Sequence, residues 1–147
     1  MNSEKDLWVL GHKITPINNS GDFDAVIGES KPGIAGPPPH FHNKFTELFF
    51  MLEGEIEFII NGKTRIAKPG DYIDLPPHTV HTYKNRSDSI SRWLNIHSPR
   101  GFLSFYNEVG FDTVSAHGFE NSVSEFIITK VFTRAKHYDM NFAAEPA

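Results

Sequence analysis

The first hundred residues alternate short apolar runs with turn residues, a pattern typical of closely spaced β-strands. Asn61-Gly62 predicts a two-residue hairpin, because a type I′ turn requires positive φ at both positions. Gly and Pro interrupt the chain elsewhere, most densely in residues 28–39. This spacing favours a β-sandwich or a small barrel. The predicted strands, rich in aromatic and β-branched residues, are Phe23–Ile27, Phe45–Leu52, Glu55–Ile60, Lys63–Lys68, His81–Lys84 and Arg92–His97.

The apolar period becomes helical after residue 98. Ser98 can cap a helix, and Pro99 suits the first helical position. Apolar side chains then recur at i, i+3, i+4 and i+7 before Gly110, at Phe102, Phe105, Tyr106 and Val109. This stripe predicts a first helix that packs against the barrel.

A second helix is predicted from Val123 to about His137. Ser122 and Glu125 have the spacing of a capping box at its start. We interpret residues 112–121 as a loop between the two helices. The expected organisation is one domain over residues 1–147, with a barrel at about 7–98 and a helical extension at about 99–147. The expected apolar face of the second helix consists of Phe126, Ile127, Val131 and Ala135.

Length, composition and charge narrow the class of protein. The chain has 147 residues, within the roughly 100–200 residues common for one domain. It contains no cysteine, which excludes disulfides and thiolate sites and fits a reducing cytoplasm. The net charge is −4 with no basic stripe, so no nucleic-acid partner is expected. No signal peptide or membrane span is recognisable, and we expect a cytoplasmic protein without a membrane partner.

The segment PPPHFHNKFTELFFMLEG, residues 37–54, places two histidines and a carboxylate in an otherwise apolar run. His40 and His42 are two apart, so on a strand both rings point to the same face. A turn after His42 would start a new strand that carries Glu47, where a lone carboxylate is costly unless it is paired or ligated. Imidazoles and a carboxylate converging from adjacent strands form a divalent-metal arrangement. His81 is the expected fourth ligand, because the chain turns back before it toward the first cluster.

Two motifs in this region resemble those of the cupin superfamily. The first reads His40-x-His42-x4-Glu47-x6-Gly54, and the second reads Gly70-x5-Pro76-x4-His81-x3-Asn85. The resemblance extends to small single-domain cupins of the quercetin 2,3-dioxygenase-like group through WVLGHKIT, RWLNIHSPRGFLSFYNEVG and the final helix. The sequence departs from the pattern at two turn positions. The glycine before the first histidine lies one position early, at Gly33, and His78 replaces the internal glycine of the second motif.

The resemblance implies an all-β fold, a double-stranded β-helix (jelly-roll barrel) with one or two C-terminal helices. It implies one divalent metal ion bound by His40, His42, Glu47 and His81. The ion could be iron, manganese, nickel, copper or zinc, because this ligand set accepts most first-row divalent ions. In quercetinase-like cupins the glutamate of the first motif also serves as a base toward the substrate. Glu47 is therefore the candidate catalytic residue, with a simple ligand role as the alternative.

Strand parity suggests which side chains form the wall of a substrate pocket. Tyr83 shares the face of His81, and His97 would reach the pocket if its side of the strand faces inward. An aromatic lining suits a flat or hydrophobic small molecule, although the same residues could simply fill the barrel. His78 lies in a turn, with solvent exposure and indirect support of the site as alternatives. The residues expected on the face of Glu47 are Phe45, Phe49 and Met51.

Three functions remain open at this point. The first is a metal-dependent dioxygenase that acts on a small aromatic or enolisable substrate. The second is a metal-containing module that binds a small molecule without turnover. The third, a sugar isomerase or epimerase, would favour basic residues in the lumen, whereas the inferred inward positions are mostly apolar.

The outward face of the central strand is also apolar. Leu48, Phe50 and Leu52 alternate with the inward residues, and a sheet face in water should be polar. We therefore expect a homodimer, with coverage by the C-terminal helices as the alternative.

Overall fold

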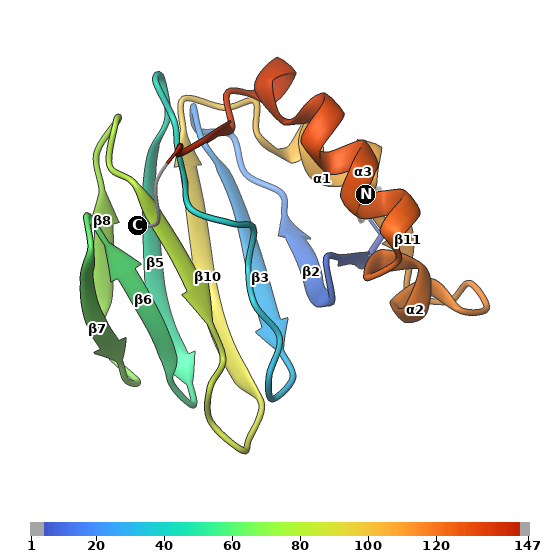
Figure 1. The fold of residues 1–147 in the computed structure, drawn as a ribbon, viewed down its shortest axis with the longest axis horizontal. Helices are drawn as coiled ribbons and strands as arrows, with labels where there is room; N and C mark the ends of the chain where they lie inside the picture. The colour runs from blue at the N-terminus through green and yellow to red at the C-terminus, as the bar shows by residue number, and fades with distance from the viewer. Residues whose placement is uncertain (1–4, 145–147) are drawn as a thin grey trace.

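Two antiparallel β-sheets form the body of the protein, which a computed structural model describes over residues 5–144 (Figure 1). The larger sheet contains β1 (Leu7–Val9), β2 (His12–Ile17), β3 (Asp24–Ser30), β5 (Thr46–Glu53), β8 (Tyr72–Leu75), β10 (Ser91–Ser98) and β11 (Phe111–Asp112). The smaller contains β4 (His40–Phe41), β6 (Ile56–Ile60), β7 (Lys63–Ala67), β9 (His81–Lys84) and β12 (Asn141–Phe142). The strand orders are β11-β1-β2-β3-β10-β5-β8 and β12-β4-β9-β6-β7.

This arrangement confirms the predicted double-stranded β-helix with C-terminal helices. The six predicted strands correspond to β3, β5, β6, β7, β9 and β10. The predicted hairpin is also present, because Ile60 pairs with Lys63 across Asn61 and Gly62, which both have positive φ. The short strands β1, β2, β11 and β12 were not predicted, because each is too short or too mixed in polarity to show a period of two.

An aromatic cluster fills the interior between the sheets at one end. The ring of Phe49 lies 5.0 Å from Phe58, 5.3 Å from Tyr83 and 5.4 Å from Trp93, measured between centroids. Trp93 needs a glycine opposite it, since a Cβ at Gly28 would lie 2.1 Å from the indole ring. The packing of this end therefore depends on a glycine, Gly28, on β3.

The helices lie together beside the β1 and β11 edge of the larger sheet (Figure 1). They are α1 (Leu103–Val109), α2 (Gly118–Ser122) and α3 (Glu125–Arg134), and the 3-10 turn η1 (Ala135–Tyr138) follows α3. Within residues 5–144, none of these helices is long and apolar enough to cross a bilayer.

The start of the first helix differs from the prediction. Ser98 ends β10 and caps no helix, and α1 begins only at Leu103. Its buried apolar side chains include Phe105 and Val109, as the stripe predicted.

Three details of the later helical region also differ. Ser124, not Ser122, caps α3, and its Oγ accepts a hydrogen bond from the Ile127 N–H. The two serines are two residues apart, so the sequence offered two candidate caps. Phe126 is 76% exposed, since only Ile127 and its i+4 and i+8 neighbours lie on the buried face. Residues 112–121 are not a simple loop but include the end of β11 and most of α2. A five-residue helix shows too little periodicity to be recognised from sequence.

Candidate metal centre

Four buried side chains converge inside the barrel. His40 and His81 are direct partners across β4 and β9, and Glu47 reaches the same point from β5 in the other sheet. His42 is the first residue after β4. The candidate ligand atoms of these four residues all lie within 4.8 Å of one another. The structure thus brings together the four side chains that the sequence singled out.

Each of the three imidazoles is oriented by a hydrogen bond from its outer nitrogen. The Nδ1 atoms of His40, His42 and His81 donate to the carbonyl oxygens of Pro38 (2.9 Å), Asp139 (2.7 Å) and Thr79 (2.9 Å). Because a carbonyl oxygen can only accept, each Nδ1 carries the hydrogen and a neutral ring keeps its Nε2 lone pair free. This is the tautomer that a metal-ligating histidine uses.

Residues 139–142 hold His42 in place from a distant part of the chain. Besides accepting from the His42 ring, Asp139 accepts the backbone N–H groups of Asn43 (2.9 Å) and Lys44 (2.7 Å) through its carboxylate. The following strand β12 pairs with β4, with Phe142 opposite His40. The turn between β4 and β5 therefore has its conformation fixed by β12 and by Asp139, two residues before that strand.

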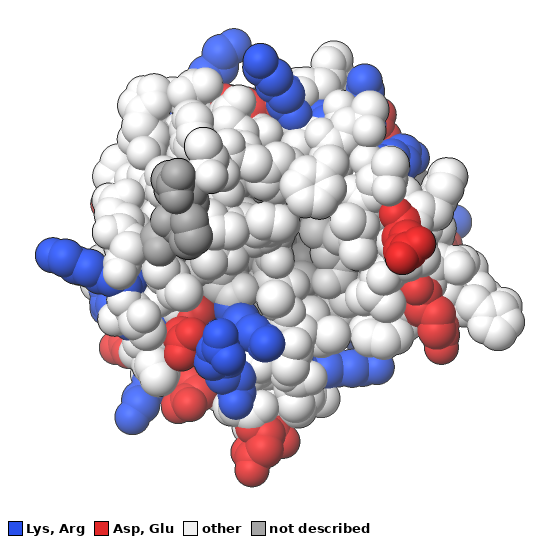
Figure 2. Space-filling model, in the orientation of Figure 1, with Lys and Arg blue, Asp and Glu red and all other residues white. Residues whose placement is uncertain are grey.

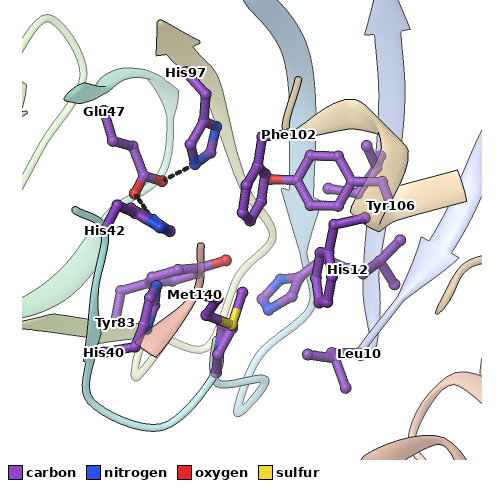
Figure 3. Close-up of a pocket in the computed structure, with 14 residues that line it drawn as sticks. Leu10, His12, His40, His42, Glu47, Tyr83, His97, Phe102, Tyr106 and Met140 are labelled. Carbon is purple, nitrogen blue, oxygen red and sulfur yellow. Dashed lines mark hydrogen bonds and ion pairs between the residues drawn. The ribbon is translucent and has the colours of Figure 1, made fainter. Parts of the chain in front are cut away.

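The two oxygens of Glu47 face different partners (Figure 3). Oε1 lies 3.2 Å from the Nε2 of His42 and 3.0 Å from that of His81. Oε2 accepts a hydrogen bond from Asn95 Nδ2 (2.8 Å) and lies 3.3 Å from His97 Nε2. Burial raises the pKa of Glu47, but the surrounding imidazoles outweigh burial and hold it well below its usual range. The carboxylate is therefore ionised.

The donor set fits a divalent metal ion. His81 Nε2 is buried and makes no hydrogen bond, although Glu47 Oε1 is 3.0 Å away. An imidazole lone pair that faces a carboxylate oxygen is repelled unless a proton or a cation lies between them. Three neutral nitrogens and one carboxylate oxygen are ligands that first-row transition metals accept. His40, His42, Glu47 and His81 could therefore hold such an ion.

Burial affects the protonation of the imidazoles in and beside the cluster differently. Burial, reinforced by the charge of His81, lowers the pKa of His40 to about 3, and burial also lowers the pKa of His97. His42 differs, because its hydrogen bond to Glu47 and the charge of that carboxylate outweigh burial and raise its pKa. In the absence of a cation, His42 is therefore the ring most ready to share a proton with Glu47.

A cavity of about 30 Å³ adjoins the cluster. Tyr83 and His97, both predicted pocket residues, line it (Figure 3). Phe45 lies beside it, with its ring 5.8 Å from His42 and 5.7 Å from His97 between centroids. Phe49 and Met51 are instead part of the apolar core and are not in the cavity wall. Wall residues that were not predicted to line a pocket include Leu10, His12, Phe102, Tyr106 and Met140.

The unpredicted wall residues come from weak or distant elements. His12 lies on the unpredicted β2, and its ring bonds to Ser30 Oγ (2.7 Å) and Ala35 O (3.0 Å). Burial lowers the pKa of His12 to about 4, so the ring is neutral. Phe102 stacks on His97 at 4.0 Å, which fixes that imidazole beside Glu47.

Tyr106 and Asn95 extend the hydrogen bonding behind the carboxylate. The Tyr106 hydroxyl donates to Asn95 Oδ1 (3.2 Å), and Asn95 donates to Glu47. On β10, Trp93, Asn95 and His97 all face inward, which settles the orientation that parity alone left open. Tyr106 could have been noticed only as an extra polar group on the helical stripe.

His78 contributes through its backbone. It has a φ of 72°, in the region that favours glycine, and its N–H donates to His42 O (2.7 Å). The position where the cupin motif has glycine is therefore a left-handed turn that supports the chain next to His42. The His78 imidazole is not in the cavity wall.

Comparisons with known proteins agree with this geometry. A family model described as "Cupin domain" matches residues 26–97. Quercetin 2,3-dioxygenase of Bacillus subtilis (strain 168) is 30% identical over 69% of this chain, but the chain spans only 29% of that protein. Germin-like protein subfamily 2 member 2 of Arabidopsis thaliana is 35% identical, over 88% of this chain and 68% of that protein.

Solved structures show the same fold. KdgF from Halomonas sp. is 26% identical with a TM-score of 0.60, covering 69% of this chain and 92% of that one. A sugar phosphate isomerase from Silicibacter pomeroyi has a TM-score of 0.56 over 59% of each chain. At 20% identity, the second likeness extends to the fold alone.

Proposed function

This chain belongs to the cupin superfamily, and on that premise we propose that it is a metal-dependent oxidoreductase of the dioxygenase type. The proposed substrate is a small aromatic or enolisable molecule, and the proposed ligands of the single divalent ion are His40, His42, Glu47 and His81. The observation that carries the proposal is the convergence of three Nε2 atoms, each with its Nδ1 hydrogen-bonded outward, on one ionised carboxylate. The ion would supply a Lewis acid with open positions and, for a redox metal, electron transfer.

The protein's own groups would orient and deprotonate the substrate. Glu47 Oε1 faces the ligand cluster, whereas Oε2 accepts a hydrogen bond from Asn95 and lies beside His97, and both Glu47 and His97 line the cavity. An ionised carboxylate placed this way can accept the hydroxyl proton of an enol or a phenol. Phe102, Tyr83 and Met140 present apolar surface around it and exclude water.

Two alternatives are less well supported. A sugar phosphate isomerase needs positive charge near its substrate, and in the described part of the chain neither Lys nor Arg lines the cavity. A binding module without turnover would need the same ligands but no base. An ionised Glu47 in the cavity wall favours the catalytic alternative.

Elemental analysis of the purified protein beside a His40→Ala, His81→Ala double variant tests the metal site. We expect near-stoichiometric iron, copper, manganese or nickel in the natural protein and none in the variant. Dioxygen uptake with a panel of flavonols, β-diketones and catechols then tests turnover. Bound metal without uptake on any member would favour the binding module, and equal metal in both proteins would refute the ligand assignment.

We also propose a homodimer formed through the outer face of the larger sheet. Phe50 and Leu52 on β5 are each 37% exposed, so the C-terminal helices leave them uncovered. Sedimentation of the natural protein beside a Phe50→Lys variant tests this, with a monomeric natural protein as the outcome that contradicts it.

A further inference from the structure

A second, larger cavity lies next to the candidate metal centre. Its volume is about 260 Å³, against about 30 Å³ for the inner cavity. It opens between residues 33–38 and α3, and the space-filling view shows a hollow lined by uncharged residues on this side of the molecule (Figure 2). Its apolar lining includes Ile34, Pro38, Val123, Ile128, Val131 and Phe132.

The wall of this apolar cavity offers no free hydrogen-bonding side chain. Ser122 has the one polar side chain in the described lining, and its Oγ donates to Phe119 O (2.6 Å) and accepts from the Gly11 N–H (3.1 Å). A ligand here would gain no side-chain hydrogen bonds, whereas burial of hydrocarbon is favourable. An apolar cavity of about 150 Å³ already suffices to bind benzene. The chemistry of the wall therefore selects hydrocarbon.

The two cavities share two wall residues, Leu10 and Pro37. Leu10 forms the β1–β2 turn with Gly11 and has a φ of 49°. The left-handed region is uncommon and strained for leucine. That conformation places the side chain between the cavities, at the end of the inner one opposite Glu47 (Figure 3).

We propose that the apolar cavity binds the hydrocarbon tail of the same small molecule whose polar head reaches the metal centre. This inference rests on the proposed function and narrows its substrate class to an enolisable or phenolic head that carries an alkyl, isoprenoid or aryl tail. The inner cavity, at about 30 Å³, has room for little more than one or two waters. A larger molecule bound at Glu47 needs space outside the inner cavity, and the space beyond the shared wall residues Leu10 and Pro37 is apolar.

A series of n-alkyl hydroxamates tests the proposal without relying on turnover. Acetohydroxamate, hexanohydroxamate and decanohydroxamate present the same chelating head with tails of increasing length, and calorimetry on the metal-loaded protein gives their affinities. We expect about a fourfold gain in affinity for each methylene that enters the apolar cavity. An affinity that does not change with tail length would overturn the proposal.

Two variants on α3 localise the effect. Ile128→Trp fills the apolar cavity from its rim, where Ile128 is 41% exposed and a larger side chain does not disrupt the core. Thr129→Trp adds the same group to the next residue, which is exposed and does not line this cavity. Ile128→Trp should abolish the dependence on tail length but leave acetohydroxamate binding within twofold, and Thr129→Trp should behave like the natural protein. Equal losses in both variants would contradict the assignment.

A metal-free measurement separates failure of this proposal from failure of the metal site. If no hydroxamate binds, not even acetohydroxamate, the metal centre is at fault. Toluene added to the metal-free protein then probes the apolar cavity directly, through the methyl NMR signals of Ile34, Ile128 and Val131. Saturable shifts confined to these methyls support the apolar site, and their absence overturns it.

Discussion

The two ends of the barrel interior are built by the same strands but differ in chemistry. Along β5 the inward side chains run from Phe49 to Glu47, and along β10 they change from Trp93 to Asn95. Two residues along a strand span only about 7 Å. Over that distance a close-packed aromatic end gives way to a polar end in which buried groups meet through hydrogen bonds and charge. Parity decides whether a side chain points inward, but its place along the strand decides which end it belongs to.

Neutralising the carboxylate at the polar end should have the largest effect. Glu47→Gln is expected to lower the rate of dioxygen uptake by ~10²–10⁴-fold while sparing most of the metal, because the amide cannot accept the substrate proton. Uptake and metal content are measured on the same preparation. Loss of all the metal would leave Glu47 only a ligand role, and undiminished uptake would exclude the base role.

Opening a void at the aromatic end should affect stability instead. Phe49→Ala is expected to lower the free energy of unfolding by about 3–5 kcal/mol, since Phe49 contacts three other rings. Urea unfolding measures the loss, and metal per folded molecule should stay unchanged. Phe126→Ala on the exposed face of α3 is the control, with an expected change within about 0.5 kcal/mol. Loss of metal in folded Phe49→Ala would show that the two ends are coupled.

Acid should destabilise the metal-free protein through its polar end. The pKa values of His12, His40 and His97 are lowered in the folded state, so below about pH 6.5 the unfolded chain binds more protons at these sites. Stability therefore falls as pH falls, by about 1.4 kcal/mol per pH unit for each extra proton, while the raised pKa of His42 works in the opposite direction. Urea unfolding at pH 7.5 and 5.5 measures the slope.

His12→Gln provides the control for this pH effect. His12 has a folded-state pKa of about 4. Its removal should therefore reduce the slope of stability against pH, between about pH 6.5 and 4, by the contribution of about one proton, or about 1.4 kcal/mol per pH unit. Equal stability at pH 7.5 and 5.5 in the natural protein would contradict the prediction.

A smaller effect is expected behind the carboxylate. Tyr106→Phe removes the hydrogen bond to Asn95 and should cost about 0.5–1.5 kcal/mol, because Asn95 still bonds to Glu47. Thermal unfolding measures this cost, and metal content should not change. A loss of metal would show that Tyr106 helps to position the ligand cluster.

The sequence predicted the polar end better than its surroundings. His40, His42 and Glu47 were recognisable because strand parity and a turn bring them together, and His81 because the chain turns back toward them. Parity also placed Phe49 and Met51 inward, but it could not tell that they belong to the packed end. His12 was missed because its strand includes polar residues and Pro16 and shows no clear alternation.

Other features depend on contacts that no local pattern encodes. The bond from His42 to Asp139 joins residues 97 apart in sequence. The cap of α3 was misplaced because Ser122 and Ser124 both precede a helical pattern, and only packing decides between them. A β-sandwich or barrel was accessible, because hairpin and strand signals are local, whereas the double-stranded β-helix was implied by the resemblance to cupins.

The attachment of residues 139–142 to β4 has a consequence for the order of events on the ribosome. All four candidate ligands leave the ribosome well before Asp139 and β12, which orient His42 and pair with the strand of His40. A nascent chain that has emerged only as far as α3 carries every ligand, yet lacks the groups that fix two of them. Metal loading should therefore follow translation of this late segment, and a stalled chain ending before Asp139 should bind the ion more weakly than the released protein.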